Sequence, residues 1–274
     1  MNYIQYTFTV NPPEPGTDIL IALLADLGFE SFTTTNTGFE AYIQKEADDE
    51  SRLADLAFDD FSYHYTRQEI ETQNWNKTWE ENFSPVYVDD LCCIRAHFHE
   101  KPAHVKHDII ITPKMSFGTG HHDTTWLMCK TMFGLNMSGQ RVLDMGCGTG
   151  VLAILAAKLG ATDIDGIDID DWSIENSVEN AEINQCAHIR FAKGDAALLI
   201  GKAPYNIVLA NINKNVLRKD MPVYAGVMKP GAQLLLSGFF TVDVAELRDV
   251  AEKAGLTWVA SYSKNEWAVI HLKK

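Results

Sequence analysis

A chain of 274 residues, 46% of them hydrophobic, is long enough for two domains and apolar enough to form packed cores. Its formal net charge of −14 argues against direct binding to nucleic acid, because a protein that grips a phosphate backbone usually carries a basic face. The same charge would attract a basic partner, although it also fits a role in solubility alone.

Export and membrane insertion leave sequence patterns that are missing here. The start, Met1 to Gln5, has no basic segment followed by an apolar core, and no run approaches the roughly 20 apolar residues that span a bilayer. The five cysteines include no C-x-x-C pair, which argues against a disulfide scaffold and a zinc ribbon. We therefore expect a cytoplasmic protein with reduced thiols and no membrane contact.

Residues 1–66 are predicted to form a small domain of alternating strands and helices. Apolar periodicity and the Pro and Gly breaks favour, in order, the elements Ile4–Val10 (strand), Asp18–Leu27 (helix), Ser31–Thr35 and Phe39–Gln44 (hairpin), Asp48–Phe58 (helix) and Phe61–Ile70 (strand). The order β-α-β-β-α-β is typical of a ferredoxin-like domain.

One strand of this domain partly echoes an RNA-recognition module, in the run from Gly38 to Ile43. Glu40 puts a negative charge where bases and phosphates would lie, so an ordinary amphipathic strand is favoured. A docking module for another protein fits this domain better.

Residues 67–84 are predicted to form a linker helix that leads into a second domain at residues 85–274. Trp75, Trp79 and Phe83 recur at every fourth position and so share one side of a helix. This aromatic stripe either packs against a domain or flanks a ligand site.

The second domain opens with short predicted strands at Pro85–Val88, Leu91–His97 and Asp108–Thr112. The same segment contains His97, His99, His104 and His107. Imidazole is a common metal ligand, but no carboxylate or cysteine is interleaved at a ligand spacing. We therefore predict no metal site.

A polar turn at Met115–Thr125 precedes the predicted helix Trp126–Phe133. Asp123 or Thr124 would make a suitable N-cap for that helix. A cap alone does not explain the cluster of hydroxyls, glycines and histidines in the turn. The turn is therefore predicted to line a pocket rather than to be a solvated loop.

The stretch Arg141–Gly150 reads as a buried strand that turns sharply into a helix. Glycine removes the Cβ atoms that would keep a ligand off the backbone, and the start of the helix offers free N–H groups. A nicotinamide dehydrogenase spaces its glycines G-x-G-x-x-G to seat a pyrophosphate. Here Gly146, Gly148 and Gly150 run G-x-G-x-G with Asp144 ahead of them, which disfavours a dinucleotide site.

Polar side chains end the strands that follow, at the edge where α/β sheets bind ligands. Asp168 lies about 20 positions after the glycine turn, which is the spacing of a ribose-binding carboxylate. Asp195 follows the predicted strand His188–Ala192, and Asn211 ends the predicted strand Tyr205–Ile212. Because an asparagine side chain includes an acceptor, Asn211 can hold an amine substrate by accepting its N–H.

This constellation resembles the class I S-adenosylmethionine-dependent methyltransferases and, within them, the bacterial methyltransferases of ribosomal protein L11, the PrmA family. The similarity spans nearly the whole chain and is carried by the Trp75–Pro85 linker, the Phe-Gly-Thr-Gly-x-His-x-Thr-Thr turn at Phe117–Thr125, the Asp144–Gly150 motif and the Asn211-Ile212 strand end. The Phe117–Thr125 turn is the most specific of these motifs, because general methyltransferases lack it.

The resemblance implies an α/β fold, with a seven-stranded doubly wound sheet and a small N-terminal α+β ferredoxin-like domain. In such a sheet the last hairpin inserts an antiparallel strand. The other predicted elements are the helices Trp172–Asn184, Val216–Val227 and Val242–Ala254 and the strands Ala232–Ser237, Thr257–Ser261 and Glu266–Leu272. In the first of these helices, Ile174, Val178 and Ala181 are predicted to face inward.

The resemblance also implies a site for S-adenosyl-L-methionine. We expect the cofactor-binding residues to be Thr125, Gly146, Asp168, Asn211, Asp144, Gly148, Gly150, Asp195, Phe117 and Gly118. The implied substrate is ribosomal protein L11, modified on its N-terminal amine and lysine side chains and recognised by the N-terminal domain. We expect a monomer. Asn213-Lys214-Asn215 stands where the family usually has small apolar residues.

Asn211 is the single catalytic residue that we predict. The methyl group is already activated, so the enzyme mainly has to align a neutral amine with it. No His or Glu falls inside the Asn211 motif, so no side chain is expected to act as an indispensable general base.

Two alternative functions remain open at this point. One is methylation of another protein amide or of RNA, although those enzymes commonly carry Asn/Asp-Pro-Pro-Tyr/Phe where this chain has Asn211 to Lys214. The other is a non-catalytic ribosome-assembly protein that keeps the fold, against which the intact motifs argue.

Overall fold

The computed structural model describes residues 3–54, 56–70, 83–114 and 116–274. The chain divides into two compact units, Met1–Phe83 and Ser84–Lys274. The predicted linker helix, including Trp75 and Trp79, falls mainly on residues 71–82, outside the described residues. Among the helices that are described, none has the length and apolar content needed to cross a bilayer.

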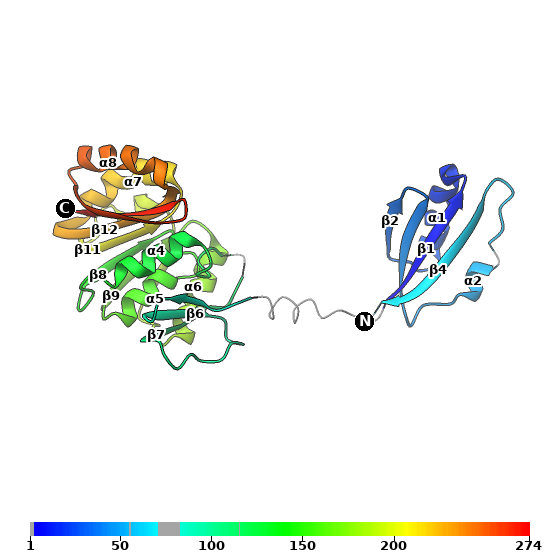
Figure 1. Ribbon diagram of the computed structural model, residues 1–274, viewed down its shortest axis with the longest axis horizontal. Helices are drawn as coiled ribbons and strands as arrows, with labels where there is room; N and C mark the ends of the chain where they lie inside the picture. Colours follow the sequence, from blue (N-terminus) through cyan, green and yellow to red (C-terminus); the bar gives the residue numbers. More distant parts are fainter. Residues whose placement is uncertain (1–2, 55, 71–82, 115) are drawn as a thin grey trace. The chain divides into compact units, whose positions relative to one another are not determined.

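The N-terminal unit is a four-stranded antiparallel sheet in the order β2-β3-β1-β4 with α1 packed against it (Figure 1). Its elements are β1 (Tyr3–Asn11), α1 (Pro13–Asp26), β2 (Ser31–Thr35), β3 (Gly38–Gln44), α2 (Ser51–Ala54) and β4 (Ser62–Ile70). Alternate side chains of β1 are buried, as the period of two in a half-buried strand requires. The β-α-β-β-α-β order confirms the predicted ferredoxin-like unit.

The second helix of this unit is shorter than predicted. The sequence pattern favours a helix at residues 48–58, whereas α2 spans Ser51–Ala54 and residues 56–58 are not helical. The Asp49 side chain accepts hydrogen bonds from the backbone N–H of Ser51 (3.2 Å) and from its hydroxyl (2.6 Å). Such local bonds compete with the helical ladder. Phe58 instead packs against the core of the unit.

The C-terminal unit is built on a seven-stranded sheet in the order β10-β9-β8-β11-β12-β14-β13 (Figure 1). Its strands are β8 (Arg141–Met145), β9 (Asp163–Asp168), β10 (Arg190–Lys193), β11 (Tyr205–Asn211), β12 (Met228–Phe240), β13 (Thr257–Lys264) and β14 (Trp267–Lys273). The pairs from β10 to β12 are parallel, and β14 lies antiparallel between β12 and β13. This confirms the predicted doubly wound sheet and its inserted antiparallel strand.

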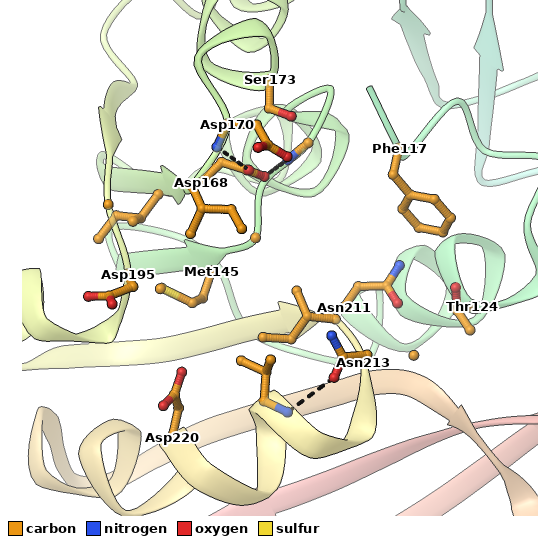
Figure 2. A pocket seen from close by; sticks show the side chains of 18 of the residues that line it. Phe117, Thr124, Met145, Asp168, Asp170, Ser173, Asp195, Asn211, Asn213 and Asp220 are labelled. Atoms are coloured by element: carbon orange, nitrogen blue, oxygen red, sulfur yellow. Dashed lines mark hydrogen bonds between the residues drawn. The ribbon is translucent and has the colours of Figure 1, made fainter. Parts of the chain in front are cut away.

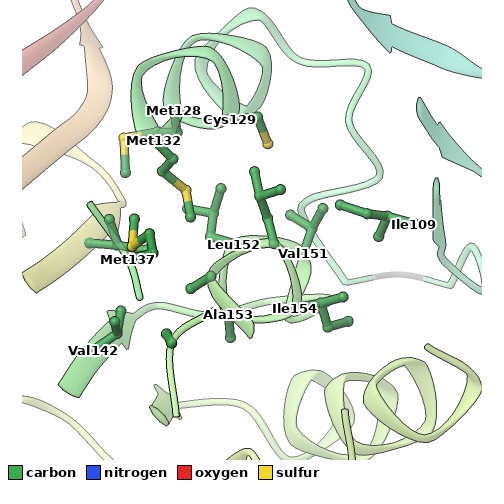
Figure 3. Packing of buried hydrophobic residues seen from close by; sticks show 14 of the residues in the cluster. Ile109, Met128, Cys129, Met132, Met137, Val142, Val151, Leu152, Ala153 and Ile154 are labelled. Carbon is green, nitrogen blue, oxygen red and sulfur yellow. The ribbon is translucent and has the colours of Figure 1, made fainter. Parts of the chain in front are cut away.

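Helices cover both faces of this sheet. The helices are α4 (Asp123–Met132), α5 (Val151–Lys158), α6 (Asp171–Ile183), α7 (Lys214–Gly226) and α8 (Val244–Lys253), with 3-10 turns η1 (Ala196–Leu199) and η2 (Thr241–Asp243). One core holds the inner sides of α4 and α5, where Met128 and Met132 lie close to Leu152 (Figure 3). The other holds those of α7 and α8. The described apolar residues of the N-terminal unit form a core of their own.

A small three-stranded sheet precedes α4 in the same unit. It consists of β5 (Val86–Val88), β6 (Cys92–Arg95) and β7 (His107–Ile110), close to the predicted positions. Arg95 and Asp108 form a bidentate ion pair across it, at 2.8 and 2.9 Å.

The buried face of α6 is polar, contrary to the predicted apolar face. Ala181 is buried as predicted, but Val178 is 41% exposed. Asn180 is fully buried, accepts the N–H of Thr112 (2.8 Å) and donates to the carbonyl of Thr149 (2.9 Å). The buried face of α6 therefore forms hydrogen bonds with backbone groups of two loops that have no regular secondary structure to pair with. Hydrophobic periodicity in the sequence does not reveal such polar contacts.

Candidate active site

A cavity of about 560 Å³ opens at the carboxyl ends of β8, β9 and β11 (Figure 2). Its size suits a small-molecule ligand, and its place is where open α/β sheets bind them. Of the residues predicted from the sequence, those that line it are Phe117, Gly146, Gly148, Asp168, Asp195 and Asn211. The others do not line it: Thr125, Asp144, Gly118 and Gly150. Their assignment as cofactor contacts stays a prediction, and the contacts that they do make are described below.

The glycine turn between β8 and α5 needs its glycines for two reasons. Gly146, Gly148 and Gly150 have φ values of 70°, 53° and 78°, in the left-handed region that other residues rarely adopt. In addition, a Cβ atom on Gly148 would overlap the carbonyl oxygen of Phe117, and one on Gly146 would overlap the side chain of Ile212. The turn thus brings bare backbone to the floor of the cavity.

Thr149 joins the two glycine-containing turns. Its N–H donates to the carbonyl of Phe117 (2.9 Å), and its hydroxyl donates to the carbonyl of Gly118 (2.8 Å). The polar turn that precedes α4 is therefore fixed against the turn that precedes α5. This explains why two motifs about 30 residues apart in sequence form one site, and it places Gly118 behind the cavity wall as a support.

Asp168 ends β9, is only 9% exposed and holds the glycine turn. Its Oδ2 accepts the N–H of Gly148 (2.8 Å), and its Oδ1 accepts the N–H of Asp170 (3.1 Å). Each carboxylate oxygen can accept more than one hydrogen bond. Asp168 can therefore accept two hydroxyl groups from a ligand while it continues to shape the turn.

Asp144 does not line the cavity and instead forms a hydrogen bond that supports the fold. It is 1% exposed, and its Oδ2 accepts the N–H of Ala153 (3.0 Å) near the start of α5. Its Oδ1 is buried without a partner among the described residues. Burial raises the pKa of Asp144 to about 7. Its position favours a role in holding the start of α5 beneath the glycine turn.

Asn211 ends β11, lines the cavity and has one buried side-chain atom without a partner among the described residues. Its Nδ2 donates to the hydroxyl of Thr125 at 3.4 Å, whereas its Oδ1 is buried and has no partner among the described residues. Thr125 itself is 1% exposed and lies on α4. A buried carbonyl without a donor costs about 1–3 kcal/mol, so a ligand that supplies an N–H there is favoured.

An aromatic wall stands beside Asn211, formed by Phe117, His122 and Trp267. The His122 ring lies 5.4 Å from the Phe117 ring and 4.5 Å from the Trp267 ring, centroid to centroid. His122, and not Asp123 or Thr124 as predicted, is the N-cap of α4, because its Nδ1 accepts the N–H of Thr124 (3.3 Å). The cap therefore also fixes a ring that lines the cavity.

A sequence model of the family described as "Ribosomal protein L11 methyltransferase (PrmA)" matches residues 23–274. The chain belongs to the ribosomal protein L11 methyltransferase family. A relative of that name from Bacteroides fragilis is 43% identical over 98% of this chain and 99% of its own. Another relative of that name, from Porphyromonas gingivalis, is 43% identical over 98% of this chain and 97% of its own.

The fold of this L11 methyltransferase family member is also similar to a solved structure. The crystal structure described as ribosomal protein L11 methylase from Lactobacillus delbrueckii subsp. bulgaricus covers 69% of this chain and 97% of its own, with a TM-score of 0.64. At 23% identity, that likeness supports the fold alone.

The departure from the family pattern after Asn211 builds the start of α7. Asn213 is the N-cap of that helix and accepts the N–H of Val216 at 3.2 Å. Lys214 forms ion pairs with Asp243 (2.7 Å) and Glu246 (3.2 Å). Lys214 thus ties the start of α7 to η2 and to the first turn of α8.

Several residues that line the cavity of this methyltransferase belong to no motif that predicts a site from the sequence. They include Ile169, Asp170, Trp172, Asn213, Asp220 and Trp267. The first three follow Asp168 closely, so their place at a strand end was a usable signal. Asp220 lies in the middle of α7 and Trp267 in the last hairpin, where only the folded arrangement brings them to the site.

The histidines of the early strands serve packing in the described structure. The N–H of Ala96 donates to Nδ1 of His99 (3.1 Å), the His104 ring stacks on Tyr87, and burial lowers the pKa of His107. Within the described ranges, no three His, Cys, Asp or Glu side chains are arranged to hold a metal ion. All five cysteines are buried and free.

Proposed function

We propose that this chain transfers the methyl group of S-adenosylmethionine to the N-terminal amine and lysine side chains of ribosomal protein L11. The observation that carries the proposal is the buried, unpaired Oδ1 of Asn211 at the cavity wall. In this proposal that atom accepts an N–H from an entering amine. The substrate is a ribosomal component, so we place the reaction in the cytoplasm.

The residues of the cavity fit the cofactor. Gly146 and Gly148 line the cavity with backbone to which an amino-acid tail can bond, and Asp168 offers acceptors for the two ribose hydroxyls. Among the described lining residues, four are aspartates and none is lysine or arginine. Such a lining favours a ligand with a cationic centre and disfavours a phosphate-bearing dinucleotide.

The protein has to align the amine with the methyl group and to exclude water from the reacting atoms. When bound, S-adenosylmethionine supplies a methyl group that its positive sulfur already activates. Asn211 orients the amine by accepting one of its N–H groups, and Thr125 holds the amide in the orientation that leaves Oδ1 free. This is catalysis by proximity, in which small displacements of the reacting atoms have large effects on rate.

The amine must enter as the neutral species, because an ammonium has no lone pair to attack with. A free lysine has a pKa of about 10.4. A lysine bound against the aromatic rings of Phe117, His122 and Trp267 would lose part of its water shell, which would lower the pKa of that lysine. Nδ1 of His122 is engaged by the N–H (3.3 Å) and the hydroxyl (2.8 Å) of Thr124, so that nitrogen is not free to take a proton from the amine.

In this proposal the N-terminal unit binds the protein substrate. Residues 1–70 contain 13 acidic and 3 basic residues, so this unit carries a net charge of −10 out of the −14 of the chain. Complementary charge steers a basic partner to such a surface. The described residues of this unit also form a hydrophobic core of their own.

A labelling experiment tests both parts of the proposal. Incubated with labelled S-adenosylmethionine and unmethylated L11, the full chain should label L11, and mass spectrometry should locate the label on lysine side chains and on the N-terminal amine. A chain lacking residues 1–70 should bind S-adenosylhomocysteine with unchanged affinity and lose at least about 90% of the labelling rate, because steering and docking are removed. Full labelling by the shortened chain would refute the docking role. No label on L11 from the full chain would refute the proposed function.

A further inference from the structure

The turn between β13 and β14 is fastened to the start of α4 by a single carboxylate. Asp123 is the first residue of α4, and it is not among the described residues that line the cavity. Its Oδ1 pairs with Nζ of Lys264 at 2.8 Å, and its Oδ2 accepts a hydrogen bond from Nδ2 of Asn265 at 2.6 Å. These two bonds lower the pKa of Asp123, so the carboxylate is charged at neutral pH.

Further contacts restrict the same turn. Nζ of Lys264 lies 4.7 Å from the centre of the Trp126 ring, which is a cation–π distance. Asn265 has a φ of 53°, in the left-handed region that asparagine adopts more readily than most residues. The carbonyl of Glu266 accepts the N–H of Thr241 at 2.8 Å. One exposed ion pair contributes little by itself, but here several contacts act on one turn and together hold it in one position.

The two segments that Asp123 joins each supply a ring to the cavity lining. His122 directly precedes Asp123, and Trp267 follows the turn as the first residue of β14. Their rings both line the cavity, with centroids 4.5 Å apart. The Trp267 ring also lies 4.2 Å from the Phe240 ring. The carboxylate of Asp123 therefore joins the same two segments that meet at the contact between His122 and Trp267.

We infer that Asp123 is a positioning residue, which fixes the Trp267 ring in the cavity wall by holding Lys264 and Asn265 on α4. The inference rests on the proposed function, in which the substrate amine binds against this wall. Without Asp123, the ring contact with His122 alone would join the two segments, and the Trp267 ring would shift. A lysine beside a displaced ring would keep more of its water shell and lose its alignment with the methyl group.

Kinetics of L11 methylation test this role. Asp123→Ala should lower kcat about fivefold, a small part of the hundredfold loss that misplacement by about 1 Å causes. The KM for S-adenosylmethionine should not change, because the glycine turn and Asp168 remain intact. Asn265→Gly should act in the same direction, since glycine accepts the backbone of the turn but lacks the amide. Asp123→Asn keeps an acceptor oxygen and carries the test if Asp123→Ala does not fold.

A double-mutant cycle with Trp267→Leu separates positioning from a general structural role. If Asp123 acts through the Trp267 ring, Asp123→Ala should change kcat less than about twofold once that ring is absent. A loss of about fivefold in both backgrounds would show that the two residues act independently and would overturn the inference. An unchanged kcat in Asp123→Ala itself would overturn it as well.

Fluorine NMR of protein labelled with 5-fluorotryptophan measures the position of the ring without relying on activity. The chain has six tryptophans, and the Trp267 signal is the one missing from Trp267→Leu. Asp123→Ala should shift or broaden that signal. Glu252→Ala is the matched control and should leave it unchanged. It removes an exposed ion pair to Arg248 (3.0 Å), whose guanidinium also lies over a tryptophan ring, that of Trp258.

The outcomes for this inference and for the proposed function are distinct. An unmoved Trp267 signal in Asp123→Ala would overturn the positioning role and leave the proposed function standing. If the wild-type protein does not methylate L11, the proposed function fails and this inference with it.

Discussion

Replacing Asn211 by alanine should lower the single-turnover rate of methyl transfer to L11 about 100-fold, while the affinity for S-adenosylmethionine changes less than about threefold. Its Oδ1 has no partner in the cavity wall and serves the amine, whereas Asp168 and the glycine turn serve the cofactor. Loss of the acceptor leaves the amine without alignment, and misplacement by about 1 Å is enough for a hundredfold loss. Rapid-quench kinetics and calorimetry measure the two quantities.

A companion variant sharpens this expectation. Thr125→Val keeps the volume of the side chain but removes the hydroxyl that accepts the N–H of the Asn211 amide. The amide can then turn and present its NH₂, so the rate should fall about tenfold at unchanged cofactor affinity. If cofactor binding collapses in Asn211→Ala, Asn211 mainly holds the cofactor and its alignment role is wrong.

Replacing Asp168 by alanine should weaken binding of S-adenosylmethionine by about 1.5–3 kcal/mol, or about ten- to a hundredfold, from the loss of charge-assisted hydrogen bonds alone. A further loss should come from the glycine turn, because the N–H of Gly148 then has no acceptor. Asp168→Asn keeps one acceptor oxygen and should recover part of the affinity.

Asp171→Ala is the matched control for the Asp168 variants. Its side chain lies three residues further along the chain, is 68% exposed and pairs only with Lys193 at 2.6 Å among the described residues. It should leave cofactor affinity within experimental error. Wild-type affinity in Asp168→Ala, measured by calorimetry on folded protein, would reject the assignment of the ribose to Asp168.

The polar residues at the strand ends are the part of the site that the sequence predicts best. Asp168, Asp195 and Asn211 each follow a short β-rich run, and parallel strands bring their carboxyl ends to one edge of the sheet. The glycine turn was equally readable, because its glycines are demanded by φ values and by the approach of Phe117 and Ile212. Local pattern and fold agree at these positions.

Other features depend on contacts that no local pattern reports. The inner face of α6 is polar because Asn180 must satisfy backbone groups of two distant loops. Asp220 reaches the cavity from the middle of a helix, and Trp267 reaches His122 from the last hairpin. Thr125 was expected to contact the cofactor, yet it lies outside the lining and bonds to Asn211. Tertiary contacts decide all four positions.

We propose that the methyl donor binds with its methyl group beside the unpaired oxygen of Asn211. A crystal structure of the protein with S-adenosylmethionine measures this directly. The ribose hydroxyls should lie within about 2.5–3.0 Å of the Asp168 carboxylate. The methyl group should face the Asn211 Oδ1. A cofactor whose methyl group points away from Asn211, or which binds outside this cavity, would contradict the account.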